Sequence, residues 1–163
     1  MKHLSLVWLW GIPVVAQETA IYRLDFTLRE TGQVRNYSMI VVNQGRGRVD
    51  AEQRIPYESS SANRDTLLRD RESRISVQRV GVSIDCQARE ADGPLRLNCA
   101  IRSSALAPVQ PKQPEGYPPL VHSLRTQVDT AVPLGKTVTV ATLEDPGANR
   151  KLEVSVVAKK QEE

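Results

Sequence analysis

The chain has 163 residues with 22 basic and 19 acidic side chains, so its formal net charge of +3 is small. Aromatic residues make up only 4% of the sequence, and the arginines alternate with acids. Both features disfavour the basic, aromatic-lined surface of a nucleic-acid-binding protein, and the length suits one domain rather than two.

Residues 1–16 have the pattern of a secretory signal peptide, with an apolar run that ends in the small residues of a cleavage site. We expect cleavage between Ala16 and Gln17, which leaves a single β domain of residues 17–163 that is exported to the periplasm or the extracellular space. The apolar run is shorter than the roughly 20 residues of a membrane-spanning helix, and no later segment approaches that length.

Alternating apolar residues predict a β-hairpin over residues 20–42, with Thr31-Gly32 as its turn. A two-residue loop there opposes apolar side chains in three pairs: Phe26 with Tyr37, Leu24 with Met39, and Tyr22 with Val41. After this hairpin we predict a short strand ending near Pro56, which confines it to a sheet edge. Residues 58–73 are polar and charged without a sustained period, and they predict a loop.

A second hairpin is predicted around Asp92-Gly93, where apolar residues alternate on both sides. An even loop of two or four residues places Cys86 opposite Cys99. Opposed strand residues have Cα atoms about 4.5 to 5.5 Å apart, which a disulfide accepts, so we predict that these two residues form one. We expect no metal and no other cofactor, because only His122 remains beside the two Cys after cleavage.

Residues 107–119 hold five of the ten prolines and predict an extended connector between two halves of the domain. Alternation then resumes around a three-residue turn at positions 133–135. The odd loop length predicts a hairpin with two apolar-matched pairs: Thr130 with Val138, and Val128 with Val140. A closing strand follows over residues 152–158. The sequence therefore predicts an all-β, antiparallel β-sandwich-like domain of seven or eight strands.

Candidate catalytic groups are few, and we predict no catalytic residues. His122 adjoins Ser123 at the end of the proline-rich segment, but adjacency in sequence does not create a triad, and an exposed loop histidine is the simpler interpretation. Two acidic pairs fall in predicted turns, where carboxylates are ordinary solubilising groups: Glu90 with Asp92, and Glu144 with Asp145.

Three other motifs have simple structural interpretations. Gly45-Arg46-Gly47 lacks the Gly-Lys-Ser/Thr end of a phosphate-binding loop. Arg46, Arg48 and Arg54 suit phosphate or an anionic glycan, but acids interleave with them, which favours a solvated strand face. Asn36-Tyr37-Ser38 is a glycosylation acceptor only in a eukaryotic secretory system, and we expect a bacterial one.

Residues 125–145, RTQVDTAVPLGKTVTVATLED, resemble a late β segment of the secretin family, the ring-forming outer-membrane channels of bacterial secretion and pilus systems. Residues 151–160, KLEVSVVAKK, are similar to the strand that follows in that family. The resemblance over residues 125–160 implies a component of a larger β assembly. Elsewhere the chain resembles small exported bacterial proteins, with Tyr-Arg-Leu-Asp-Phe opening and Gly-Val-Ser-Ile-Asp-Cys central strands.

These observations predict an exported, non-catalytic binding or structural module of the bacterial cell envelope. Its expected partner is another envelope protein, engaged through strand edges. One alternative is a secretin-like or secretion-system-associated component that joins a larger assembly through residues 124–158. Another is an exported hydrolase, which would need a concave pocket containing His122 or a close carboxylate pair.

Overall fold

The computed structural model describes residues 20–60, 73–90, 93–107 and 118–161. These residues form β1 (Ile21–Glu30), β2 (Gln33–Val42), β3 (Arg46–Ser60), β4 (Ser73–Glu90), β5 (Leu95–Leu106), β6 (Val121–Val132), β7 (Thr137–Asp145), the 3-10 turn η1 (Pro146–Ala148) and β8 (Arg150–Gln161). The predicted signal peptide and its Ala16–Gln17 cleavage site lie outside the described residues.

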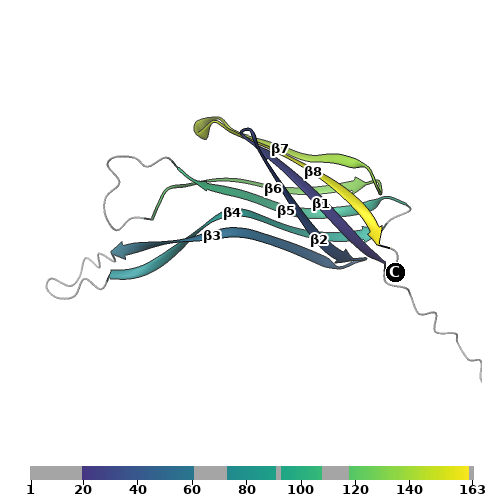
Figure 1. The fold of residues 1–163 in the computed structure, drawn as a ribbon, viewed down its shortest axis with the longest axis horizontal. Helices are drawn as coiled ribbons and strands as arrows, with labels where there is room; N and C mark the ends of the chain where they lie inside the picture. The colour runs from purple at the N-terminus through teal and green to yellow at the C-terminus, as the bar shows by residue number, and fades with distance from the viewer. Residues whose placement is uncertain (1–19, 61–72, 91–92, 108–117, 162–163) are drawn as a thin grey trace, which may run out of the picture.

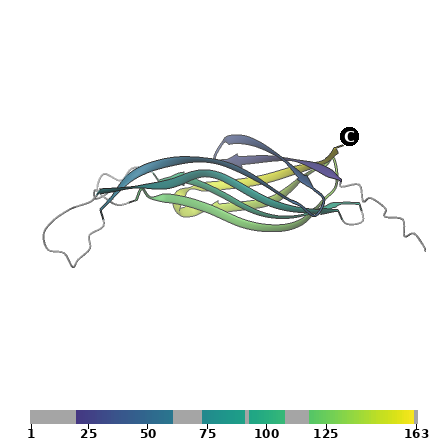
Figure 2. The same cartoon turned by 90° about the horizontal axis from the view of Figure 1, so that it is seen from below.

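The strands form two antiparallel four-stranded sheets, sheet A with the order β2-β1-β8-β7 and sheet B with the order β3-β4-β5-β6. Two views at right angles show the sheets stacked as layers (Figures 1 and 2). The predicted all-β, sandwich-like fold is confirmed.

The register of the first hairpin is confirmed, because Phe26 opposes Tyr37, Leu24 opposes Met39 and Tyr22 opposes Val41 in β1 and β2. Thr31 and Gly32 have φ angles of 42° and 82°, the two positive values of a type I′ turn. This turn matches the right-handed twist of the strands that it joins. The turn residues and the apolar alternation therefore specify the same pairing.

The β4–β5 hairpin likewise has the register expected from its loop, with Cys86 opposite Cys99. The two residues form a disulfide with their Cα atoms 4.1 Å apart, and both side chains are buried in the core. A bridge that closes so short a ring contributes about 3 kcal/mol at most by restricting the unfolded chain. Its main effect is to hold the central pair of strands of sheet B in register.

The core lies between the two sheets and is built from the alternate residues that face inward. Burying each large apolar side chain contributes about 1.5 to 3 kcal/mol. The largest fully buried side chains come from both sheets: Tyr22, Phe26, Leu24, Leu28, Ile84, Leu95, Leu97, Ile101, Leu152, Val41, Val82 and Val132.

The hairpin predicted around residues 133–135 is wrong. β6 pairs with β5, and β7 pairs with β8, so Thr130 and Val128 do not oppose Val138 and Val140. The turn instead crosses from sheet B to sheet A, where the Gly135 N–H donates to the Ala158 carbonyl at 2.8 Å. The apolar faces of β6 and β7 can meet across the core as well as within one sheet. β7 therefore lies in sheet A, where it is hydrogen-bonded to β8.

Two predicted connections also differ in the structure. The proline-rich segment joins β5 to β6, which are hydrogen-bonded neighbours in one sheet, so it is a hairpin loop and not a crossover between halves. The Ala107 N–H donates to the Leu120 carbonyl at 2.9 Å and closes this loop; residues 108–117 lie outside the described ranges. In the loop predicted for residues 58–73, β3 continues to Ser60 and β4 begins at Ser73.

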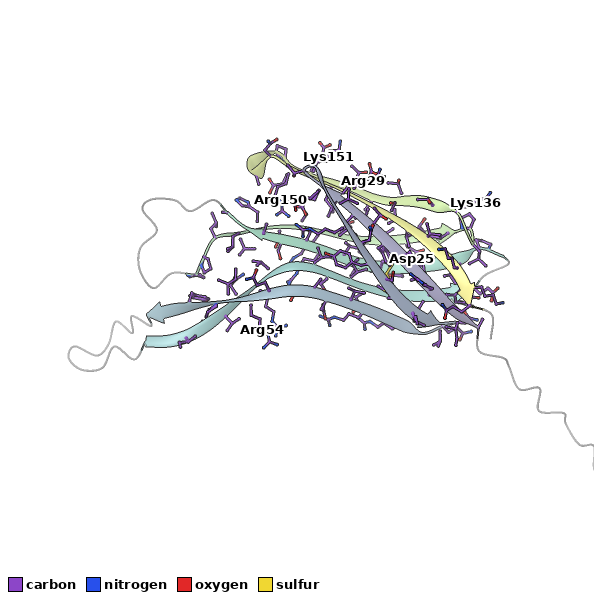
Figure 3. All side chains as sticks on the ribbon, viewed as in Figure 1. Asp25, Arg29, Arg54, Lys136, Arg150 and Lys151 are labelled. Carbon is purple, nitrogen blue, oxygen red and sulfur yellow. A yellow bond between two sulfur atoms is a disulfide. The ribbon has the colours of Figure 1, made fainter. Side chains whose placement is uncertain are left out.

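A buried polar cluster ties the two sheets together at one end of the core. Arg150, at the start of β8 (Figure 3), donates from Nε to the Glu30 carboxylate at 2.7 Å and from Nη1 to the His122 carbonyl at 2.8 Å. The Ser103 hydroxyl donates to the same carboxylate at 2.8 Å. The side chains of Arg150 and Glu30 are only 10% and 12% exposed. Each polar group of the cluster therefore has its partner inside the protein.

Tyr22 makes the corresponding tie at the other end, where its buried hydroxyl donates to Glu90 Oε2 at 2.5 Å. Burial, the hydrogen bond to Glu90 and the charge of Glu90 together raise the pKa of Tyr22 from 10.0 to about 12. The neutral phenol therefore stabilises the folded state below pH 10, and this contribution is lost as the pH rises from 10 to 12.

We expect Tyr22→Phe to flatten the fall in unfolding free energy between pH 10 and 12, because the variant has no phenol to titrate at this site. Urea unfolding at several pH values, together with phenolate absorbance, measures the effect. Lysines titrate in the unmodified protein and in the variant alike, so the difference in slope between the two proteins reports on Tyr22. Equal slopes in the two proteins would contradict the assignment.

Candidate functional site: the open edge of strand β4

The predicted base and hydroxyl do not form a catalytic pair. His122 lies in β6 rather than in an exposed loop, and its Nδ1 is 3.8 Å from Asp145 Oδ2, with both side chains about one-third exposed. Ser123 is the next residue of the same strand, so its side chain projects from the opposite face of the sheet. The two groups cannot act on one substrate atom.

The acidic pairs are also divided among structural contacts. Glu90 ends β4 and contacts Tyr22 and, at 3.9 Å, Lys160; Asp92 lies outside the described residues. Glu144 binds Lys151 at 2.7 Å, whereas the Asp145 carboxylate accepts from the Ala148 N–H at 3.2 Å and so caps η1. Among the residues that the structure describes, no group of three or more His, Cys, Asp or Glu is arranged to hold a metal ion.

The basic residues of β3 occupy the solvated strand face that was predicted. Arg46 binds Asp85 and Arg48 binds Asp50, and both arginines are largely exposed. The hydrogen bond from Arg46 lowers the pKa of Asp85. Arg54 projects from the outer part of β3 (Figure 3), and Asn36 is an exposed residue of β2 that bonds Thr27. Within the described ranges, no helix is long and apolar enough to cross a bilayer.

A two-stranded extension of sheet B, which we call the arm, is formed by residues 53–60 of β3 and 73–80 of β4. These residues continue the β3–β4 ladder beyond its last shared position with β5, where Gly81 opposes Ser104. Figure 1 shows the arm reaching past the stacked sheets. A two-stranded ribbon alone in water is marginally stable, so this element depends on the sandwich or on a partner for its order.

The sheet forks at Gly81 because Ser104 satisfies the backbone there. The Gly81 N–H donates to Ser104 Oγ at 3.1 Å, and the Ser104 hydroxyl donates to the Gly81 carbonyl at 3.2 Å. A side chain thus replaces the next backbone partner, and the β4–β5 ladder ends. Beyond this point the β5 side of β4 is an open edge.

The hydrogen-bonding direction along β4 follows from the disulfide. The 4.1 Å separation of the Cys86 and Cys99 Cα atoms identifies a non-hydrogen-bonded pair, so the odd-numbered residues of β4 direct their backbone groups toward β5. The contacts of Gly81 agree with this assignment. In the arm, the N–H and C=O groups of Ile75, Val77 and Arg79 therefore point away from β3. Pro56, opposite Val77, lacks an N–H at the corresponding outer position of β3, as edge strands require.

Apolar side chains are exposed along the same open edge. Ile75 is 76% exposed and Val77 is 52% exposed, and Leu106 and Leu120 are about half exposed at the end of the neighbouring hairpin. Exposed apolar groups beside unpaired backbone are the features of an edge that receives another strand. The sequence predicted binding through strand edges and an edge strand ending near Pro56. It missed the continuation of β3 to Ser60 and the start of β4 at Ser73, because residues 58–73 were interpreted as a loop. The signal that was not used is the alternation of Ile75 and Val77 with polar residues.

Comparison with known proteins gives a similarity of fold. No protein-family model and no curated protein sequence matches the chain. Among solved structures, the secretin InvG of the Salmonella SPI-1 type III secretion injectisome has a TM-score of 0.51 and 12% identity, over 89% of this chain and 64% of that one. ExeD of Aeromonas hydrophila has a TM-score of 0.55 and 11% identity, over 89% of this chain and 47% of that one.

The chain thus spans less than two thirds of the length of these two structures. The secretin resemblance expected over residues 125–160 is confirmed at the level of fold, and it extends across most of the chain. The fold of this protein is similar to that of secretin structures.

Proposed function

We propose that this protein is an exported, non-catalytic β-sandwich module of the bacterial cell envelope that binds a partner protein by strand addition at the open edge of β4. The observation that carries the proposal is the row of outward-facing backbone groups at Ile75, Val77 and Arg79, next to exposed apolar side chains. A partner strand would satisfy these groups and cover the apolar surface. The signal-peptide pattern of residues 1–16 supports export.

The proposal predicts that Val77→Pro abolishes partner binding while the fold is retained. Proline removes the N–H that faces the open edge, whereas the β3–β4 ladder does not use that group. A photo-cross-linking residue at position 75, introduced into the full chain in the cell that produces it, should give one adduct of defined mass. Val77→Pro should remove this adduct, and Val77→Thr, which retains the N–H, should keep it.

A cross-linker at position 127, on the outer face of sheet B, is the matched control and should give no such adduct. Far-ultraviolet circular dichroism and a thermal melt of Val77→Pro establish that the sandwich is intact. Adducts that survive Val77→Pro, or that form equally from position 127, would contradict strand addition at this edge.

A second candidate function is that of a secretion-system-associated component of a larger β assembly. The fold similarity to the injectisome secretin InvG over 89% of this chain favours it. This candidate predicts a high-mass species when the exported protein is analysed by native electrophoresis or light scattering. A clean monomer would contradict it and would leave the strand-addition proposal standing.

A further inference from the structure

A polar groove of about 470 Å³ crosses the outer face of sheet B, at the end of β4 opposite to the arm. Its volume lies within the range of about 300 to 1,000 Å³ typical of small-molecule sites. The groove is lined by Gln44, Gln87, Arg89, Arg96, Asn98 and Asp129. None of these residues takes part in the contacts that tie the two sheets together.

Two of the lining residues are like charges placed directly opposite each other. Arg89 of β4 pairs with Arg96 of β5 in the ladder, and both side chains are exposed. Such a cross-strand pair of like charges destabilises a sheet. Arg96 is partly compensated by Asp129, whose Oδ1 accepts from Arg96 Nε at 3.0 Å. Arg89 has no ion pair with a carboxylate in the part of the chain that the structure describes.

Three other arginines on the same face of sheet B, Arg46, Arg48 and Arg102, are paired with acids. Arg46 binds Asp85, and Arg48 binds Asp50 at 2.7 Å. Arg54 and Arg79 also oppose each other on this face, but they lie in the arm, outside the groove. Within the groove, Asp129 balances one of the two guanidinium charges, and the charge of Arg89 is left without a carboxylate among the described residues. An anion bound between the two guanidinium groups would supply the missing partner.

Gln44 adds an amide to the groove at a backbone position that disfavours it. Its φ of 61° lies in the left-handed region, where glycine or asparagine is preferred in a turn. The turn is fixed to β4, because Asn43 Oδ1 accepts from the Glu90 N–H at 2.9 Å. The turn therefore holds Gln44 beside the groove although the backbone conformation of this residue is costly, as expected of a residue that contacts a ligand.

We propose that this groove binds an anionic sugar, with the charged group between Arg89 and Arg96. The planar guanidinium fork suits the oxygens of a carboxylate or a phosphate. The amides of Gln44, Gln87 and Asn98 both donate and accept hydrogen bonds, which matches the hydroxyl groups of a sugar ring. The Asp129 carboxylate can accept a hydrogen bond from a further hydroxyl group. The site is separate from the open edge of β4, so the inference does not depend on the proposed function.

Three matched probes test the inference: D-galacturonate, D-galactose 6-phosphate and D-galactose, which share one sugar skeleton. Nuclear magnetic resonance titration of the mature protein should show shifts of the Arg89 and Arg96 Nε–H signals with the two anions and not with galactose. The anion that binds more tightly identifies carboxylate or phosphate as the charged group. Arg89→Gln should weaken anion binding roughly ten- to hundredfold, because a charge-assisted hydrogen bond is lost.

Arg48→Gln is the control, because it removes the same charge from the same face of the sheet, outside the groove, and it should leave the affinity unchanged. Without ligand, Arg89→Gln should melt at the same temperature as the unmodified protein or higher, since the like-charge repulsion is relieved. Weaker binding is then not a folding defect. The inference is overturned if galactose binds as tightly as the anions, if neither anion binds at millimolar concentrations, or if Arg48→Gln has the same effect.

Discussion

Arg150→Ala is expected to lower the free energy of unfolding by about 3 to 5 kcal/mol, the cost of leaving a buried charge without its partner. The Arg150 guanidinium bonds the Glu30 carboxylate and the His122 carbonyl, and it also donates to Ser103 Oγ at 3.3 Å. Alanine leaves these acceptors in a site that solvent hardly reaches. Urea denaturation at neutral pH measures the loss.

Arg29→Ala is the matched control, because Arg29 bonds Glu153 at 3.3 Å on the surface with its side chain 64% exposed. An exposed ion pair contributes no more than about 1 kcal/mol. The double variant Glu30→Leu/Arg150→Met removes both charges and should be more stable than Arg150→Ala. A loss from Arg150→Ala that is no larger than the loss from Arg29→Ala would show that the buried cluster does not tie the sheets.

Gly81→Ala is expected to lower the free energy of unfolding by about 3 kcal/mol, since steric overlap adds to backbone strain. A Cβ atom at this position would lie 2.2 Å from the Ala51 carbonyl oxygen and 2.9 Å from the Glu52 Cα, both backbone atoms of β3. The φ of Gly81 is +135°, which L-residues rarely adopt. Denaturant unfolding measures the loss, and faster amide hydrogen exchange in β3 and β4 would locate it.

Gly135→Ala separates strain from overlap. Gly135 also has a positive φ, 74°, but an added Cβ there meets no atom within 4 Å, so the expected loss is about 1 kcal/mol. If the two alanine variants lost the same stability, close approach of β3 to Gly81 would not be the reason for glycine at the fork.

The two hairpin registers were predictable because two independent local signals agree in each. In the first, the Thr31-Gly32 turn fixes a two-residue loop, and the alternation of Leu24 and Phe26 with Met39 and Tyr37 accepts only that register. In the second, the loop parity and the cysteine spacing agree in the same way. Such information lies within about twenty residues of sequence and needs no knowledge of distant strands.

The partner of β7 was not predictable by the same means. Joining Thr130 to Val138 matches apolar faces, but so does stacking β6 over β7 on opposite sides of the core. β7 pairs instead with β8, the next strand in the chain, with Asp145 opposite Arg150. β8 lies in sheet A because it also pairs with β1, and no turn residue encodes that contact between the two ends of the chain.

The outer part of the arm was missed for a different reason. Ile75 and Val77 alternate with polar residues, but both are exposed, and without one-sided burial this alternation is too short to identify a strand. The groove was predictable only in part. The register of the second hairpin already places Arg89 opposite Arg96. Gln44, which also lines the groove, comes from the turn between β2 and β3, and the position of this turn against β4 is set by tertiary packing.

The adjacency of β1 and β8 in sheet A has a consequence for how the chain acquires its structure. The inner face of β1, which carries Leu24 and Phe26, stays uncovered on one flank until residues 150–161 have been synthesised. A chain that lacks these residues holds the β1–β2 hairpin and the four strands of sheet B without a completed core. Mean sequence separation between contacting residues is high in such a topology, so folding should be slow, on the order of milliseconds to seconds, and should be completed only when β8 is available to pair with β1.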